Sequence, residues 1–421
     1  MKQLFAVIFT GIIVSCYYFS FGFALLPSSV NTKMILAIIG VLLYVVNSIR
    51  AKRMPLSMNL LGAMGFAIVF SAICFYSTDI NHTNDYTYAS YIVSFFTWLG
   101  GAYSVVSLIR YNHGTASFRL LTAYLAGVCT AQCILALLID RVQPLKAFVD
   151  RYIDQGQEFL NEVNRLYGIG ASLDPAGVRF SIVLVLIAVL LSRNEFVRRD
   201  RKYMLGLLSS FFIVSVVGSM VSRTTGLGMI MGLTYLIWST RIVTLVIEKE
   251  YMKFFSVFVF MIAVVAAIST YLYNADHAFH ENLRFGFEGF FNWVETGVWK
   301  TSSTDKLNSQ MWIWPTDNQT WLIGSGTFGL FTFGTDIGYC RFILYCGLIG
   351  FGVFALFFVY NGILFFQKAG RYKWAFCLLI MLSFIVWLKV ATDIFLIYAL
   401  FYCFTEREWE GNRLVTNPLA V

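Results

Sequence analysis

The chain has 421 residues, of which 58% are hydrophobic and only 13% are charged. A soluble domain carries roughly 25% charged residues, so this composition excludes an ordinary soluble globular protein. The formal net charge of +8 comes from short basic clusters between apolar runs, not from one continuous basic face, so no nucleic-acid partner is expected.

Apolar runs that are long enough, or nearly long enough, to cross about 30 Å of hydrocarbon recur through the whole chain. We therefore predict an all-α, polytopic integral membrane protein with about twelve transmembrane helices, forming a single transmembrane domain over 1–421. The predicted runs are 4–26, 33–49, 58–76, 88–109, 118–140, 179–192, 203–221, 225–247, 254–273, 339–366, 374–390 and 392–404.

The lysines and arginines favour one orientation of these runs. When the N-terminus is placed in the cytoplasm, every basic cluster between runs lies inside, as the positive-inside rule requires, and both termini are cytoplasmic. The predicted cytoplasmic clusters are Arg50 to Arg53, Arg110 with Arg119, Arg193 to Lys202, Lys249 with Lys253, and Lys368 to Lys373.

Two long segments, 141–178 and 274–339, are too polar to span and are predicted to be external loops. In the first, apolar residues recur at helical spacing opposite charged ones, which predicts one amphipathic helix over 145–167 that lies on the membrane or caps the bundle. Its predicted apolar face consists of Leu145, Phe148, Tyr152, Phe159, Val163 and Leu166.

Arginines on the predicted external side are candidates for binding phosphate groups. Arg223 lies between two apolar runs in "VSRTTGLG", where a cation needs an anionic partner or a wet cavity, and its planar fork suits phosphate better than lysine does. The alternative is an arginine that only marks the membrane interface. The other arginines predicted on this side are Arg165, Arg179, Arg284 and Arg341.

The second loop is rich in aromatic residues, which either form an interfacial belt or stack on sugar rings. The candidates for glycan stacking are Trp293, Trp312, Trp314 and Tyr339. Among its acidic residues, Asp336 stands out because it falls between a glycine-rich turn and the start of an apolar run. The alternative role for Asp336 is to cap the following helix.

Several chemistries have no motif in this chain. The sequence contains no Walker A motif, no HExxH, no GxSxG and no external Asp-x-Asp, so we expect neither a nucleotide cofactor nor a metal. An enzyme of this kind must act on a substrate that carries its own activation.

The chain resembles the bacterial O-antigen and exopolysaccharide polymerases, which share a superfamily with the O-antigen ligases. The similar stretches are "RLYGIGASLDPAG", "SRTTGLGMIMGL", "WLIGSGTFG" and "TDIGYCRFILYCGLIGFG", in this order over the C-terminal two thirds. Many relatives carry His-Asn where this chain has Asp336 and Ile337, a departure that argues against a ligase.

The resemblance implies a GT-C-like fold and a metal-independent, inverting transfer at the outer face of the bacterial cytoplasmic membrane. The expected substrates are polyprenyl-pyrophosphate-linked oligosaccharide repeat units, which are joined into O-antigen, capsule or exopolysaccharide. In this interpretation the five arginines bind the pyrophosphate, and Asp336 is the general base, with His277 and His280 as weaker candidates. Membrane lipid and a chain-length-regulating protein are further candidate partners.

Two other functions remain open at this point. One is an O-antigen ligase that transfers glycan to the lipid A core. The other is a twelve-span transporter or flippase for the same lipid-linked glycan. A transporter usually carries its functional charges near the bilayer midplane, whereas the charges and tryptophans here concentrate in the external loops, which favours an enzyme.

Overall fold

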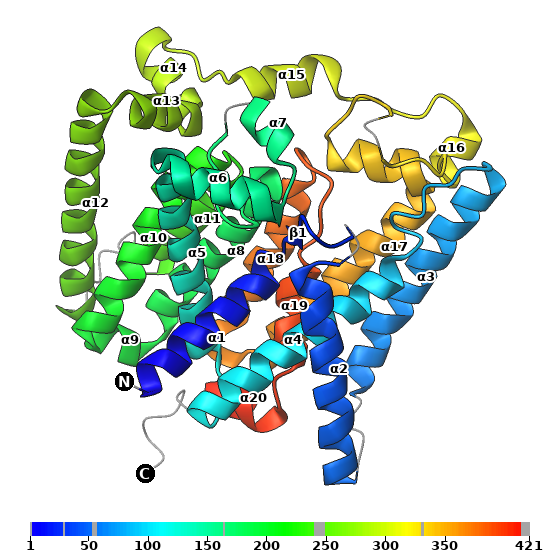
Figure 1. Cartoon of the computed structure of the whole chain (residues 1–421), viewed down its shortest axis with the longest axis horizontal. Coiled ribbons are helices and arrows are strands. Elements are labelled where there is room, and N and C mark those ends of the chain that lie inside the picture. The colour runs from blue at the N-terminus through cyan, green and yellow to red at the C-terminus, as the bar shows by residue number, and fades with distance from the viewer. Residues whose placement is uncertain are drawn as a thin grey trace.

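The computed structural model confirms the all-α class. It describes residues 2–27, 30–52, 57–162, 165–239, 249–329 and 332–413. In these ranges the only sheet is a pair of two-residue strands, β1 (Gly22–Phe23) and β2 (Ile153–Asp154), and the other regular elements are helices (Figure 1).

Eight of the described helices are long and apolar enough to cross a membrane, so the chain is a multi-pass membrane protein by helix length and hydropathy. They are α2 (Thr32–Ala51), α3 (Met58–Ile80), α4 (Tyr91–His113), α5 (Phe118–Arg141), α8 (Leu173–Arg193), α10 (Arg201–Val221), α12 (Lys249–Ala275) and α17 (Gly338–Lys368).

The other four predicted runs form shorter helices, so fewer full-length spans are described than the twelve expected. Residues 240–248, at the end of one such run, lie outside the described part. A helix rises 1.5 Å per residue, so even the 17 residues of α1, the longest of the four as described, reach only about 26 Å. The short helices are α1 (Lys2–Tyr18), α11 (Thr225–Ser239), α18 (Lys373–Val386) and α19 (Phe395–Tyr402).

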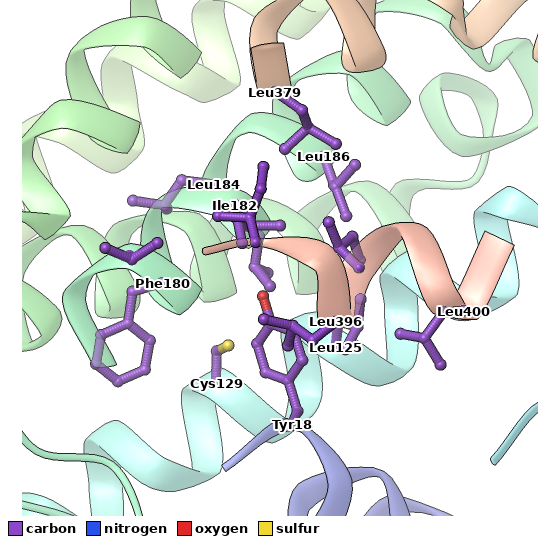
Figure 2. Close-up of a cluster of buried hydrophobic side chains, with 14 of the residues drawn as sticks. Tyr18, Leu125, Cys129, Phe180, Ile182, Leu184, Leu186, Leu379, Leu396 and Leu400 are labelled. Atoms are coloured by element: carbon purple, nitrogen blue, oxygen red, sulfur yellow. The ribbon is translucent and has the colours of Figure 1, made fainter. Parts of the chain in front are cut away.

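Helix α8 lies at the centre of the bundle. Its sequence "FSIVLVLIAVLLS" is apolar on every side, which is typical of a helix enclosed by others. Within its most apolar stretch, 89% of the residues are buried. Helices α5, α10, α11 and α18 pack around it. Figure 2 shows Ile182, Leu184 and Leu186 of α8 in one buried cluster with Leu125 of α5 and Leu379 of α18. This central position fixes where the N-terminal end of α8 emerges.

The first segment that we predicted to be external, 141–178, is not the single amphipathic helix expected from its sequence. It forms α6 (Gln143–Tyr152), then strand β2, then α7 (Gln157–Glu162). The helix breaks because β2 pairs antiparallel with β1 and because Gly156 has a φ of 77°, in the left-handed region.

The predicted apolar face of this segment is also only partly right. Phe148 and Phe159 are 59% and 53% exposed, whereas Val149 and Leu160 are buried against Ile139 at the end of α5. The break between the two helices changes which side chains face the bundle. Val163, the fifth residue of the predicted face, lies outside the described residues.

The second segment that we predicted to be external, 274–339, forms four short helices and no span in its described residues, as expected from its polarity. They lie at one end of the bundle, opposite the start of α1 and the C-terminal α20 (Figure 1). The four are α13 (His277–Gly286), α14 (Glu288–Thr296), α15 (Ser302–Gln310) and α16 (Asn318–Leu322). At the opposite end lie α9 (Glu195–Arg199) and α20 (Glu406–Arg413), and α20 packs against the 3-10 turn η2 (Gly370–Tyr372).

Helix α17 is interrupted at Gly347, whose φ of 65° and ψ of −177° belong to a region that is essentially restricted to glycine. The carbonyl groups of Leu344 and Tyr345, which precede the break, accept hydrogen bonds from the backbone N–H groups of Ser325 and Gly326, at 2.7 and 3.0 Å. The glycine-rich segment therefore replaces the helical partners lost at the break. This arrangement fixes the start of α17 relative to the second loop.

Replacing Gly347 with alanine should destabilise the protein. The unfavourable backbone conformation costs about 1–3 kcal/mol for a residue with a side chain. A Cβ atom there would also lie 2.2 Å from the carbonyl carbon of Leu322. Thermal unfolding in detergent should show a lower Tm for Gly347→Ala. Gly352→Ala, in the same helix, should leave Tm unchanged or raised, because its Cβ meets nothing within 4 Å. Equal Tm values for the two variants would contradict this account of the break.

Candidate functional site

Three segments meet at one carboxylate at the loop end of the bundle. Oδ1 of Asp174, in the first turn of α8, accepts hydrogen bonds from Ser222 and Thr224, which lie between α10 and α11, at 2.8 and 2.6 Å. It also forms an ion pair with Lys389, in the link between α18 and α19, at 2.8 Å. Lys389 in turn donates to Thr224 Oγ1 at 3.0 Å.

A cavity of about 390 Å³ opens above this carboxylate. Its walls come from the α8 end, from the links around Arg223 and Lys389, and from α13 and α15 of the second loop. The size falls within the range of about 300–1,000 Å³ that is usual for small-ligand sites. Four basic and two acidic side chains line it, so its lining carries an excess of positive charge; they are Arg165, Arg223, Lys306, Lys389, Asp174 and Asp336.

Two of the predicted arginines lie against the same aromatic ring in this cavity. The guanidinium carbons of Arg165 and Arg223 lie 3.7 and 4.1 Å from the ring centroid of Phe285, which belongs to α13. Burial lowers the pKa of both guanidinium groups, and the proximity of Arg223 lowers that of Arg165 further. Both still carry their charge at neutral pH, because the ordinary pKa of arginine is above about 12.

Arg223 is held by several groups of the second loop. Its Nη1 pairs with Glu288 at 2.6 Å and its Nε donates to the carbonyl of Phe285 at 3.0 Å. Within the described residues Arg165 forms no ion pair, so Glu288 balances the charge of Arg223 alone. Such a partly buried pair of cations is suited to an anion with several oxygens, as a phosphate or pyrophosphate is.

Asp336 lies on the wall of the same cavity, two residues before α17 begins. The cap position of that helix is Ile337 and no side chain caps it, so the structure does not support the capping role. Burial raises the pKa of the Asp336 carboxyl, and the nearby Arg341 opposes this shift. Within the described residues no donor hydrogen-bonds to this carboxylate. It is therefore available to accept a proton from a ligand.

The other three arginines lie elsewhere. Arg341 donates to the carbonyl of Phe328 at 2.6 Å and lines a separate, much smaller hollow. Arg179 lines a different cavity, of about 320 Å³. Arg284 pairs with Glu295 at 2.6 Å on the exposed surface. Of the five predicted pyrophosphate ligands, the structure thus brings Arg165 and Arg223 together with Asp336.

The predicted glycan-stacking residues do not form one group. Trp312 and Trp314 are 41% and 40% exposed, and Trp314 stacks on Trp321 with ring centroids 5.7 Å apart. Trp293 lies on α14 and is 53% exposed. Tyr339 is different because its hydroxyl donates to the carbonyl of Phe384 at 2.9 Å inside the bundle. Its ring is thereby directed into the helix packing.

The two weaker candidates for the base also lie apart from Asp336. His277 begins α13, and His280 stacks on Tyr273 with ring centroids 4.0 Å apart. Neither histidine lines the cavity that holds Asp336.

Sequence reasoning missed three charged residues of the site, namely Asp174, Lys389 and Lys306. A signal for two of them was present. Lys389 falls within a predicted apolar run, and Asp174 lies just before one, and an ionisable residue at membrane depth is by default a functional candidate. Lys306 gave no such signal, because it lies on a polar helix and reaches the cavity only through the path of the loop.

Comparison with known protein families, with characterised proteins and with solved structures gives no significant match over any part of the chain.

The cavity should bind inorganic pyrophosphate through its two stacked arginines. Arg223→Gln should weaken binding by about tenfold or more, because a charged hydrogen-bond donor to the anion is lost. Titration calorimetry on the purified protein would measure the Kd. Arg284→Gln is the matched control, since Arg284 is a surface arginine with a carboxylate partner of its own. Equal Kd values for the two variants would exclude this cavity as the anion site.

Proposed function

We propose that this protein is a glycosyltransferase that joins polyprenyl-pyrophosphate-linked oligosaccharide repeat units into a surface polysaccharide. One observation carries the proposal. The same cavity contains two guanidinium groups that lie against Phe285 and the Asp336 carboxylate, which forms no ion pair with any described residue. The sequence resemblance to O-antigen and exopolysaccharide polymerases points to the same reaction.

The arginines would act on the leaving group. When the bond between the anomeric carbon and the pyrophosphate oxygen breaks, its electron pair passes to the pyrophosphate, whose negative charge grows. Guanidinium groups that are already in place stabilise this developing charge without having to reorganise. Arg165 and Arg223 are held in this way by the Phe285 ring and, for Arg223, by Glu288.

Asp336 would act on the acceptor. A sugar hydroxyl attacks the anomeric carbon from the face opposite the pyrophosphate, a new C–O bond forms, and the configuration inverts. The hydroxyl proton passes to the Asp336 carboxylate, which no described residue engages. A carboxyl whose pKa is raised is a stronger base once it has lost its proton, so the burial of Asp336 favours this role.

We propose that this chemistry takes place on the outer face of a bacterial cytoplasmic membrane, with both termini inside. Two features support this orientation. The cavity lies at the end of the bundle that carries α13 and α15, while α1 begins and α20 lies at the other end (Figure 1). The basic clusters around Arg50, Arg198 and Arg371 belong to the links at that second end. Twelve crossings of the membrane remain the expected number, with the described parts of α1, α11, α18 and α19 shorter than a full span.

Replacing Asp336 should stop transfer without removing the donor. Asp336→Asn should reduce the rate of chain elongation by about 10²- to 10⁴-fold, the usual contribution of a general base. The measurement is the ladder of products that purified protein makes from lipid-linked repeat units. Asp305→Asn is the matched control, because Asp305 is an exposed aspartate of α15 that pairs with Lys300 outside the cavity. A normal ladder from Asp336→Asn would rule out this carboxylate as the base.

The pH profile gives an independent check on Asp336. Since burial raises its pKa, the carboxylate form should be lost as pH falls at a value above the ordinary aspartate pKa of about 3.9. Activity should therefore fall on the acid side with a midpoint above that value. In an Asp336→His variant, residual activity should fall with a midpoint near pH 6.5, the ordinary pKa of histidine. An unchanged acid limb in Asp336→His would show that another group sets it.

A further inference from the structure

A second cavity lies on the other side of the α8 N-terminus. It has a volume of about 320 Å³, and Leu173 and Pro175 line both this cavity and the arginine cavity. The first turn of α8 is thus a shared wall. No part of the mechanism above uses the second cavity.

The walls of this second cavity are fixed by backbone geometry. Strands β1 and β2 pair Gly22 with Asp154, which ties the segment after α1 to the segment after α6. Gly170 has a φ of 69°, and a Cβ there would lie 2.4 Å from the carbonyl oxygen of Phe19. The N–H of Gly170 donates to Oε1 of Gln155 at 2.6 Å. These contacts hold together three of the chain segments that line the cavity, namely those around Gly22, Gln155 and Gly170.

The lining of the second cavity mixes donors and acceptors. It offers a carboxylate, two amides, two hydroxyls and one guanidinium, from Asp154, Asn31, Gln155, Ser20, Ser172 and Arg179. Within the described residues neither Asp154 nor Arg179 forms an ion pair. Hydroxyl groups both donate and accept, so a sugar can satisfy such a set. A pyrophosphate fits less well, because the one carboxylate of this lining balances its one guanidinium and leaves no excess of positive charge.

We infer that this second cavity is a saccharide subsite that holds the acceptor glycan beside the donor. The inference rests on the proposed function, because joining two repeat units requires two sugar chains bound next to each other. The pyrophosphate of the donor lies with Arg165 and Arg223, and the acceptor chain crosses the α8 N-terminus to reach Asp336. Arg179 and Asp154 then bind acceptor hydroxyls, and Arg179 does not contact the pyrophosphate.

The test separates acceptor from donor. Mild acid releases the repeat-unit oligosaccharide from its lipid pyrophosphate, which leaves an acceptor that can no longer act as a donor. Calorimetry should show that this lipid-free oligosaccharide binds the wild-type protein, and that Asp154→Asn and Arg179→Gln each raise its Kd about tenfold. A transfer assay with a labelled lipid-linked unit as donor and the lipid-free oligosaccharide as acceptor should agree. In both variants the KM for the acceptor should rise about tenfold, and the KM for the donor should stay unchanged. Asp79→Asn, an exposed aspartate away from both cavities, is the control.

Each outcome has one meaning. An unaltered Kd in both variants, or no binding to the wild-type protein, overturns the acceptor subsite. A higher donor KM, or displacement of the oligosaccharide by inorganic pyrophosphate, also overturns it and assigns the cavity to the donor. If the oligosaccharide binds the wild-type protein and depends on Asp154 but no transfer occurs, the saccharide subsite stands and the proposed function fails.

Discussion

The hydrogen bonds and ion pair at Asp174 Oδ1 connect the helix bundle to its candidate site. A partly buried, charged carboxylate is costly unless donors surround it, and here Ser222, Thr224 and Lys389 supply them. Because these donors come from two different interhelical links, the carboxylate fixes both links against the end of α8. This contact fixes the first turn of α8, which is the wall that the two cavities share. It also fixes Arg223, which directly precedes Thr224 in the chain.

A second constraint acts at the break in α17. Hydrocarbon offers no hydrogen-bond partners, so a broken helix must find them within the protein. The glycine-rich segment supplies them at the break in α17, and Asp85 holds that segment, with its Oδ2 accepting the N–H groups of Phe328 and Gly329 at 2.6 Å each. Although burial opposes it, hydrogen bonding from Thr87 and these two N–H groups keeps the pKa of Asp85 below its ordinary value. Asp85 thereby holds Phe328 in place, and the carbonyl of Phe328 accepts a hydrogen bond from Arg341.

The sequence was most informative where hydrophobic length alone decides the structure. The boundaries of α2, α5 and α10 agree with their predicted runs within two residues. Polar or basic residues at the ends of these apolar runs determine where the helices begin and end. Tertiary contacts decided the rest. The pairing of β1 with β2 divided the predicted amphipathic helix, since a strand partner from a distant segment leaves no local signal. Similarly, Arg223 and Asp336 were found from their places beside apolar runs, but their grouping with Arg165, and the exclusion of Arg284, depend on how the loop folds over the bundle.

The central claim is that the stacked arginines and Asp336 form a transfer site that uses lipid pyrophosphate as its leaving group. The most direct measurement is the stoichiometry of the reaction in liposomes that contain only the purified protein and lipid-linked repeat units, with EDTA present and ATP omitted. The account predicts one polyprenyl pyrophosphate released for each new glycosidic bond, with release and bond formation falling together in Arg223→Lys. Movement of the lipid-linked unit across the bilayer with no bond formed and no pyrophosphate released would contradict it and would identify a transporter instead.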